Sequence, residues 1–227
     1  VEDLDLEETR LTEDGERYYS YAADNDGRGT TDQEKREERD ERKAADITWA
    51  KDSERFALVR EDLRDVEELW VVHSTGNERP ELETYKYPMP GEDSIGHDEI
   101  WIYDLQAEEK TQVQDTTWTD PSLSIIDDRQ FRYPGSEEPR RRVWLSEGSD
   151  ELWYERSSRD RTKADLVVAD AETGEIERTV VEERFNKYFH TQRPELLSDG
   201  DVLWLSERDG WSHLYRYGPD GTVEEQL

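Results

Sequence analysis

The chain has 227 residues, of which 32% are hydrophobic and 40% are charged, and its formal net charge is −30. It contains no cysteine, which excludes disulfides and thiolate chemistry. So much negative charge disfavours nucleic acid and anionic membranes as partners, and no apolar run reaches transmembrane length. Eight Trp, eleven Tyr and four Phe lie in short alternating runs, which predicts a folded β protein rather than a disordered chain.

The surface chemistry is unusual, because 60 acidic residues face 30 basic ones and most of the basic residues are Arg. Such a surface stays soluble in concentrated salt, where the Debye length falls to about 3 Å at 1 M and self-repulsion is screened. We therefore hypothesise a halophilic source. The hypothesis requires that stability rise between dilute buffer and molar KCl.

The first part of the chain predicts two local structures. Residues 9–22 (TRLTEDGERYYSYA) contain a turn around Gly15 followed by an aromatic run, which indicates a hairpin or the last strands of a larger sheet. Residues 31–45 contain almost no apolar side chain, and their charges recur at i,i+4 spacing. This pattern predicts a solvated helical insertion with Thr31 or Asp32 as its N-cap.

From residue 46 onward the pattern is that of short β-strands. Each predicted strand is β-branched or aromatic and is bounded by turn residues such as Asp199-Gly200 and Asp220-Gly221. The strands form three groups along the chain. The first group comprises residues 47–50, 55–60, 68–73, 83–87, 99–103 and 110–113, the second 142–146, 151–156, 165–169 and 176–181, and the third 195–197, 202–206, 213–217 and 222–226.

The three groups share one layout: a short strand, an acidic turn, an aromatic strand, a polar turn, an alternating strand, a turn with Gly and an edge strand. Repeats of about 40 to 50 residues with four strands each are typical of a β-propeller. We predict an all-β fold, a partial β-propeller of about three to four four-stranded antiparallel blades. The expected units are a partial blade with the charged helical insertion at 1–45 and blades at 46–115, 140–185 and 194–227, the first full blade having an insertion between its third and fourth strands.

Several ordered motifs point to one family. Residues 80–91 read PELETYKYPMPG, residues 157–161 read SSRDR with a later D-x-x-T-G at 170–174, and residues 204–217 read WLSERDGWSHLYRY. Together with residues 49–93 as a whole, these segments resemble the N-terminal propeller of dipeptidyl peptidase IV-like serine peptidases, within the prolyl oligopeptidase family. The likeness runs from about Leu11 to the C-terminus.

The resemblance implies a two-domain peptidase in which an α/β-hydrolase domain with a Ser-Asp-His triad follows the propeller. We expect the chain to be the non-catalytic portion, which gates and positions peptide substrates for that missing C-terminal hydrolase domain and is inactive alone. The resemblance also favours a periplasmic or extracellular location. The alternative is a stand-alone binding or scaffold propeller without peptidase activity.

No catalytic residue is assigned. Residues 210–214 (GWSHL) begin like the nucleophile elbow G-x-S-x-G, but Leu214 replaces the second glycine and an alternating strand follows where a helix is required. We interpret Asp209-Gly210-Trp211 as the turn between the second and third strands of a blade. The family's paired-glutamate anchor for the substrate amine, set in W-x-Y-E-E, is not found. No such role is given to Glu68 or to the acidic pairs at 7–8, 37–38, 108–109, 137–138 and 182–183.

No metal or cofactor site is predicted. Residues 24–27 (DNDG) begin like a calcium loop, but Lys35 stands where the bidentate Glu is required, so an Asx-rich turn is the favoured interpretation. No metal-binding spacing links any two of the four histidines. They are His73, His97, His190 and His213.

Two further features concern partners. Arg140, Arg141 and Arg142 form the basic cluster of note, near Asp127-Asp128-Arg129. The cluster has two interpretations. It binds a substrate carboxylate or a neighbouring acidic face, or, as we favour, it offsets the local repulsion between carboxylates. A partial propeller also exposes strand edges and apolar faces, so we expect self-association.

Overall fold

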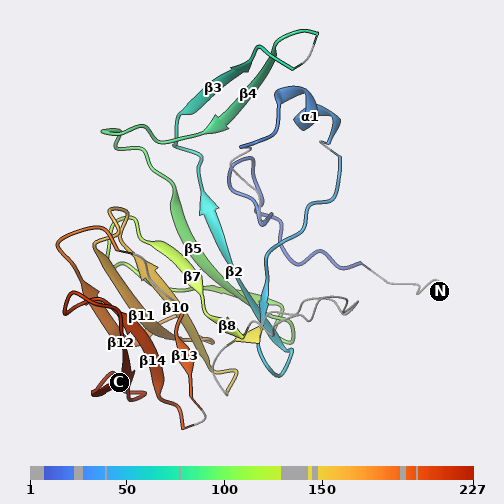
Figure 1. Ribbon diagram of the computed structural model, residues 1–227. Helices are drawn as coiled ribbons and strands as arrows, with labels where there is room; N and C mark the ends of the chain where they lie inside the picture. Colours follow the sequence, from blue (N-terminus) through green and yellow to red (C-terminus); the bar gives the residue numbers. More distant parts are fainter. Residues whose placement is uncertain are drawn as a thin grey trace, which may run out of the picture.

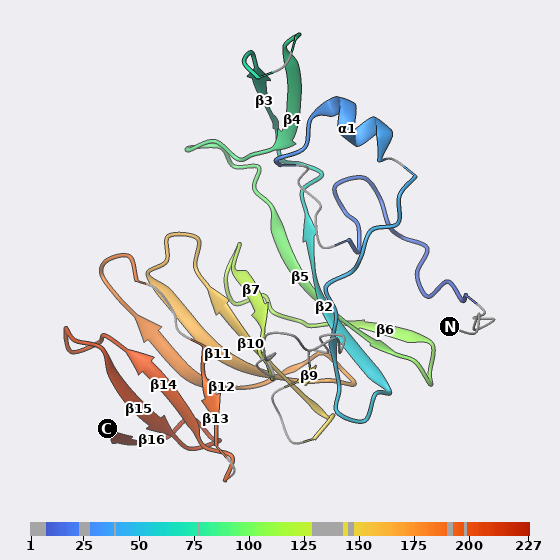
Figure 2. The ribbon, with the colours of Figure 1, turned by 45° about the vertical axis from the view of Figure 1, so that its right-hand side comes forward.

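The computed structural model describes residues 8–22, 28–38, 40–76, 78–128, 143–144, 148–189, 193–197 and 199–227. Within these residues there is one short helix, and sixteen strands form four sheets. Three of the sheets stand side by side like an opened fan, and the fourth projects from the first (Figure 1, Figure 2). The predicted all-β partial propeller is confirmed.

The first sheet is held together by the pairing of its two longest strands. β2 pairs antiparallel with β5 along its whole length, from Arg55 opposite Asp104 to Asp62 opposite His97. Its six strands lie in the order β6 (Glu109–Gln112), β5 (His97–Asp104), β2 (Arg55–Asp62), β1 (Thr48–Trp49), β9 (Val143–Trp144) and β8 (Asp127–Asp128).

A separate two-stranded sheet, here called the arm, consists of β3 (Glu68–His73) and β4 (Glu81–Lys86). The predicted place of the insertion was wrong, because the arm lies between β2 and β5, the second and third strands of the first blade. Since β2 pairs directly with β5, the sheet has no free edge there for residues 68–73. The arm therefore extends away from the fan (Figure 1).

The second sheet corrects another expectation. Residues 142–146 were predicted as its first strand, yet β9 pairs in parallel with β1 of the first sheet. The place beside β10 is taken by β7, whose Ser122 lies opposite Ser157. The pattern SLSI of β7 is short and half polar, so it gave no strand signal. The order is β12 (Ile176–Arg184), β11 (Lys163–Asp170), β10 (Glu151–Ser157) and β7 (Ser122–Ile125).

The third sheet follows the predicted layout. Its strands are paired in chain order, and the turn with Asp209, Gly210 and Trp211 joins its second and third strands. Trp204 is buried as expected of a residue wedged between blades, whereas Trp211 is 78% exposed. The strands are β13 (Glu195–Leu196), β14 (Val202–Ser206), β15 (His213–Tyr217) and β16 (Val223–Gln226).

Two hydrophobic cores fill the spaces between the sheets. Strands β10 and β11 contribute to both, because successive side chains of a strand point to opposite faces. Leu152 and Val167 lie in the core shared with Ile100 of the first sheet. Trp153 and Leu166 belong to the core shared with the third sheet. The residues of the third sheet in this second core are Val202, Trp204, Tyr215 and Tyr217.

The N-terminal hairpin prediction was wrong. Residues 8–22 contain only one isolated bridge, between Glu16 and Tyr19, and no strand. The aromatic side chains of this segment instead pack on Arg60. The ring centroids of Tyr19 and Tyr21 lie 3.3 and 4.2 Å from the guanidinium carbon of Arg60. The Arg60 side chain is fully buried and donates to Asp14 Oδ2 at 2.9 Å. These contacts fix the segment to the first sheet.

The helix α1 (Asp32–Glu37) is shorter than the predicted 31–45. Thr31 is its N-cap and forms a capping box with Glu34. No residue of α1 is buried, and charge pairs alone do not sustain a long helix. The helix nevertheless covers the edge of the arm, because Asp32 accepts hydrogen bonds from Thr84 N and Oγ1, both at 3.0 Å.

Candidate functional site

One end of the fan lies on the side of the arm (Figure 2), and we call it the arm-side rim. There β2 leads into the arm, β10 turns into β11 through residues 158–162, and β14 turns into β15 through residues 207–212. Figure 2 shows these connections at the same end of the three sheets. A cleft lies on each side of the second sheet at this rim.

The first cleft lies between the first and second sheets and has a volume of about 290 Å³. The first sheet and the residues around the arm supply one wall, and the start of β7 and the β10–β11 turn supply the other. Although the chain has a net charge of −30, cations and carboxylates are nearly equal in number here. The charged lining residues are Arg28, Lys86, Arg159, Arg161, Glu61, Asp98 and Asp120.

The charged side chains of the first cleft differ in the hydrogen-bond partners that the protein itself gives them. Lys86 Nζ donates to the carbonyl of Val66 at 2.5 Å, so it is directed away from the cleft centre toward the backbone. Arg161 donates to Ser157 Oγ at 3.0 Å. Asp98 accepts from Leu123 N at 2.9 Å, a bond that joins the first sheet to the second. Burial raises the pKa of the Asp98 carboxyl.

The second cleft lies between the second and third sheets, and its lining combines three aromatic side chains with Glu and Ser. Phe185 and Phe189 pack with their ring centroids 4.2 Å apart, and Tyr188 is exposed beside them. The buried Glu183 accepts from Ser206 Oγ at 3.0 Å and pairs with Arg208. The Glu183 carboxylate is therefore already matched by a cation.

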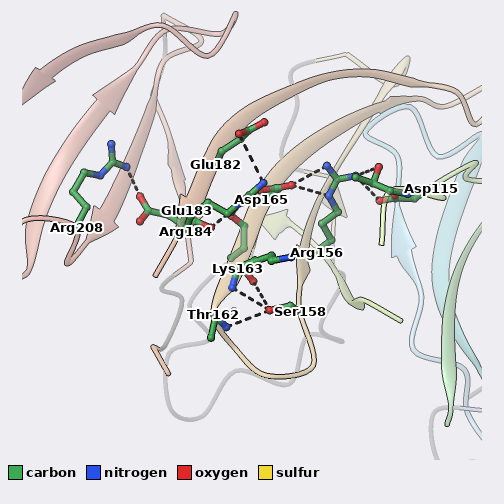
Figure 3. A network of polar contacts seen from close by, with 12 residues as sticks. Asp115, Arg156, Ser158, Thr162, Lys163, Asp165, Glu182, Glu183, Arg184 and Arg208 are labelled. Carbon is green, nitrogen blue, oxygen red and sulfur yellow. Dashed lines mark hydrogen bonds and ion pairs between the residues drawn. The ribbon is translucent and has the colours of Figure 1, made fainter. Parts of the chain in front are cut away.

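A buried ion network lies next to the β10–β11 turn of the rim (Figure 3). Arg156, whose side chain is 5% exposed, bonds Asp115 at 2.9 Å and Asp165 at 2.8 Å. Arg184 adds a second cation to Asp165. Because Arg156 comes just before the β10–β11 turn, the network fixes the base of the turn that carries Arg159 and Arg161.

Opposing effects act on the pKa of Asp115. Burial alone would raise it, but hydrogen bonds from the Tyr154 hydroxyl and Thr117 N, together with Arg156, outweigh burial and lower the pKa. The same burial and the nearby carboxylate raise the pKa of the Tyr154 phenol. Asp115 is thus an ionised carboxylate at neutral pH, held between a phenol and a guanidinium.

The elbow-like segment has no catalytic geometry. Ser212 Oγ donates to Glu207 Oε1 at 2.8 Å, and His213 Nε2 lies 3.6 Å from Asp209. The segment is a turn between two strands, so it lacks the strand-to-helix setting of a nucleophile elbow. Ser212 is bonded to Glu207 and not to a histidine, so the turn lacks the serine–histidine pair of a catalytic triad.

The other singled-out residues lie apart from one another. His73 is 2.7 Å from Glu83 in the arm, and Asp127 pairs with Arg193. Among the residues placed by the structure, no group of three or more His, Asp or Glu could hold a metal ion. In that same part of the chain, no helix is long and apolar enough to cross a membrane. Outside the described residues lie 24–27, His190, Arg129 and 140–142.

The structure assigns ion pairs to members of two of the acidic pairs, whereas Glu7 and residues 137–138 lie outside the described residues. Glu8 bonds Arg42 at 2.7 Å, and Glu183 pairs with Arg208 in the second cleft. Sequence reasoning missed Asp98, Arg159 and Arg161 as members of one cleft. The SSRDR turn was noted as a family-like segment and gave a partial signal. Nothing in the sequence placed Asp98 beside it, because their proximity depends on the pairing of β7 with β10.

Comparison with known proteins gives the family. The family model described as "Dipeptidyl peptidase IV (DPP IV) N-terminal region" matches residues 1–227. The chain is similar to the crystal structure of Porphyromonas gingivalis dipeptidyl peptidase 4, with 18% identity, a TM-score of 0.63 and coverage of 81% of this chain and 24% of that chain. It is also similar to a putative dipeptidyl aminopeptidase IV from Bacteroides ovatus, with 20% identity, a TM-score of 0.56 and coverage of 78% and 23%. The chain thus spans about a quarter of the length of these two proteins, and the likeness supports the fold. Because the family model spans the whole chain, this protein belongs to the dipeptidyl peptidase IV N-terminal region family.

Proposed function

We propose that the chain is the non-catalytic propeller portion of a dipeptidyl peptidase IV-like serine exopeptidase. Its role is to gate and position peptide substrates for a hydrolase domain of the same protein. The family match over residues 1–227 carries this proposal. The absence of a G-x-S-x-G sequence from the 227 residues agrees with a supporting rather than a catalytic role.

The arrangement of the rim supports a positioning role. Two clefts open at the end of a rigid stack of sheets, and the ion network of Arg156 fixes the loop between them. Positioning a substrate relative to a nucleophile lowers the entropic part of the barrier, so a rigid support contributes to rate without doing chemistry itself. Acyl transfer would proceed on the serine of the hydrolase domain.

The test is release of dipeptide from chromogenic Ala-Pro and Gly-Pro substrates in molar KCl, where the charge of the chain is screened. The intact protein that carries the chain is assayed beside the 227-residue chain. We expect activity in the intact protein and none in the chain. If the intact protein releases no dipeptide from any Xaa-Pro substrate, the proposal is wrong.

A second candidate function is a binding or scaffold propeller, which the outer face of the arm favours. Trp70 is 70% exposed and Val72 61% exposed, and Leu82, opposite Val72, lies on the same face. On the other face Glu83 accepts from Gly29 N at 2.7 Å, and α1 covers the edge of the arm at Thr84. A group of exposed apolar side chains on a chain that is 40% charged is typical of a contact surface.

Self-association is the partner relation that this surface supports. The third sheet offers a competing surface, because Leu214 and Val223 are also exposed. Light scattering in molar KCl over a range of concentrations tests the idea. We expect association that Trp70→Ser weakens and that the matched Leu214→Ser leaves unchanged. The opposite response would assign the contact to the third sheet, and a monomer at every concentration would exclude self-association.

A further inference from the structure

The first cleft contains a carboxylate without a cation. Asp98 accepts one hydrogen bond, from Leu123 N at 2.9 Å, and no Arg or Lys of the described chain forms an ion pair with it. Burial raises the pKa of this carboxyl, and the hydrogen bond from Leu123 N offsets that effect only in part. A partly buried carboxylate in this state is stabilised by any cation that reaches it.

The opposite wall contains the complementary charge. Arg159 forms no hydrogen bond or ion pair with any residue that the structure describes, and Arg161 uses one nitrogen on Ser157. The intervening Asp160 forms no ion pair with either arginine in the described structure, and its carboxylate accepts from Ser158 Oγ at 2.6 Å and from Thr162 N at 3.1 Å. Guanidinium groups recognise carboxylates through paired N–H donors.

The turn that carries the two arginines is already ordered. Its hydrogen bonds run from Arg161 N to Ser158 O at 2.9 Å and from Lys163 N to Ser158 Oγ at 3.0 Å. Arg161 has a φ of 55°, a left-handed conformation that these bonds hold in place. A ligand would therefore meet a backbone turn that is already ordered and lose little affinity to ordering of the loop backbone.

We propose that the first cleft binds a small zwitterion, an unblocked dipeptide, with its ammonium group at Asp98 and its carboxylate at Arg159 and Arg161. The volume of about 290 Å³ is at the lower end of ligand pockets, which suits a ligand of this size. The choice of a dipeptide rests on the proposed function, because the released product of such a peptidase carries both charges.

The charge of the whole chain favours a zwitterion over a simple ion. At low ionic strength a lone anion approaching the arginines is repelled by a molecule of net charge −30, and at any ionic strength a lone cation leaves the arginines unmatched. A ligand with both charges has no net interaction with the long-range field and satisfies both walls. In molar salt, the partly buried Asp98 is screened less than the surface carboxylates.

The test is calorimetric titration of Ala-Pro dipeptide and of its N-acetyl and C-terminal amide derivatives in molar KCl. The titrations use the 227-residue chain and the intact protein. In the intact protein, the change in affinity caused by the cleft variants distinguishes binding at the cleft from binding at the active site. The variants are Asp98→Asn, which keeps an acceptor for Leu123 N, and Arg159→Gln with Arg161→Gln. Arg36→Gln on α1 is the control for charge, and thermal melts verify folding.

We expect each cleft variant to weaken Ala-Pro binding at least about tenfold, the factor for a lost charge-assisted hydrogen bond, with Arg36→Gln unchanged. The N-acetyl derivative should not respond to Asp98→Asn, nor the amide to the arginine variants. Absent Ala-Pro binding, or equal binding of the blocked and free dipeptides, overturns the proposal. Binding to the chain needs no catalysis, so it stands or falls separately from the peptidase assay.

Discussion

The second sheet and the arm are built from similar strands and reach opposite ends of the burial range. In β10 every residue from Leu152 to Ser157 is buried, and in β11 every residue from Ala164 to Ala169. In β3 no residue is buried, and in β4 only Glu83 is. The strands β10 (ELWYERS) and β3 (ELWVVH) begin with the same three residues, so composition alone does not set the difference. The difference in burial comes from packing against neighbouring segments, because the second sheet is covered on both faces and the arm on one.

The comparison separates stability from recognition. The second sheet carries both cores and the ion network, so substitutions there act on the free energy of unfolding. The arm carries exposed Trp70 and Val72, so substitutions on its outer face act on contacts with other molecules. The following predictions test this division.

The largest effect is expected at Arg156. Arg156→Met leaves Asp165 and Asp115 as buried carboxylates without this guanidinium, which should lower the free energy of unfolding by about 3–5 kcal/mol. Chemical denaturation in molar KCl measures it. Arg178→Met, which breaks the more exposed pair with Glu151, is the matched control and should cost about 1 kcal/mol or less. Equal losses at the two sites would contradict the account.

Core truncation compares the two regions directly. Leu166 is fully buried between the second and third sheets, so Leu166→Ala should lower stability by about 2–5 kcal/mol. Val72→Ala on the outer face of the arm should change it by about 0.5 kcal/mol or less. The midpoints of the two denaturation curves measure the loss of stability in each variant. A loss at Val72 as large as that at Leu166 would show that the arm is part of the core.

A glycine pair tests the contact between blades. Gly174 and Gly210 both have positive φ, at 73° and 100°. A Cβ at Gly174 would collide with the carbonyl of Gln112 in the first sheet, whereas a Cβ at Gly210 meets nothing within 4 Å. Gly210→Ala should cost only the backbone strain, about 1–2 kcal/mol, and Gly174→Ala should cost more. Thermal melts of the two variants measure the difference, and similar melting temperatures would contradict close packing at Gly174.

The smallest effect is a pH dependence. The pKa of Asp115 is lowered in the folded state, so its contribution to stability is present above the unfolded value of about 3.9 and is lost as pH falls through the folded value. The difference in unfolding free energy between wild type and Asp115→Asn should stay constant from pH 7 to about 5 and shrink below about 4. Using a difference cancels the changing repulsion of the other carboxylates. A difference that grows on acidification would reverse the sign of the argument.

Local patterns predicted most strands and the third sheet, because each hairpin there is built from residues adjacent in sequence. The prediction of strands and sheets failed where a strand pairs with a segment that is distant in sequence. β7 is recognisable only through its pairing with β10, and Val143 pairs with Trp49 in another sheet. The aromatic run at Tyr19 resembled a strand because its partner, the buried Arg60, is invisible to local patterns. The first cleft was missed for the same reason, since Asp98 and Arg159 meet only after the sheets assemble.

The central claim, that the second sheet carries the stability of the fold whereas the arm does not, is tested most directly by native-state hydrogen exchange of the chain in molar KCl. The account predicts that amides of β10 and β11 exchange only through global unfolding, whereas amides of β3 and β4 exchange through a local opening of lower free energy. Leu166→Ala should then accelerate exchange in β10 and β11 and leave the arm unchanged. Equal protection of the two regions, falling together in Leu166→Ala, would show one cooperative unit and contradict the account.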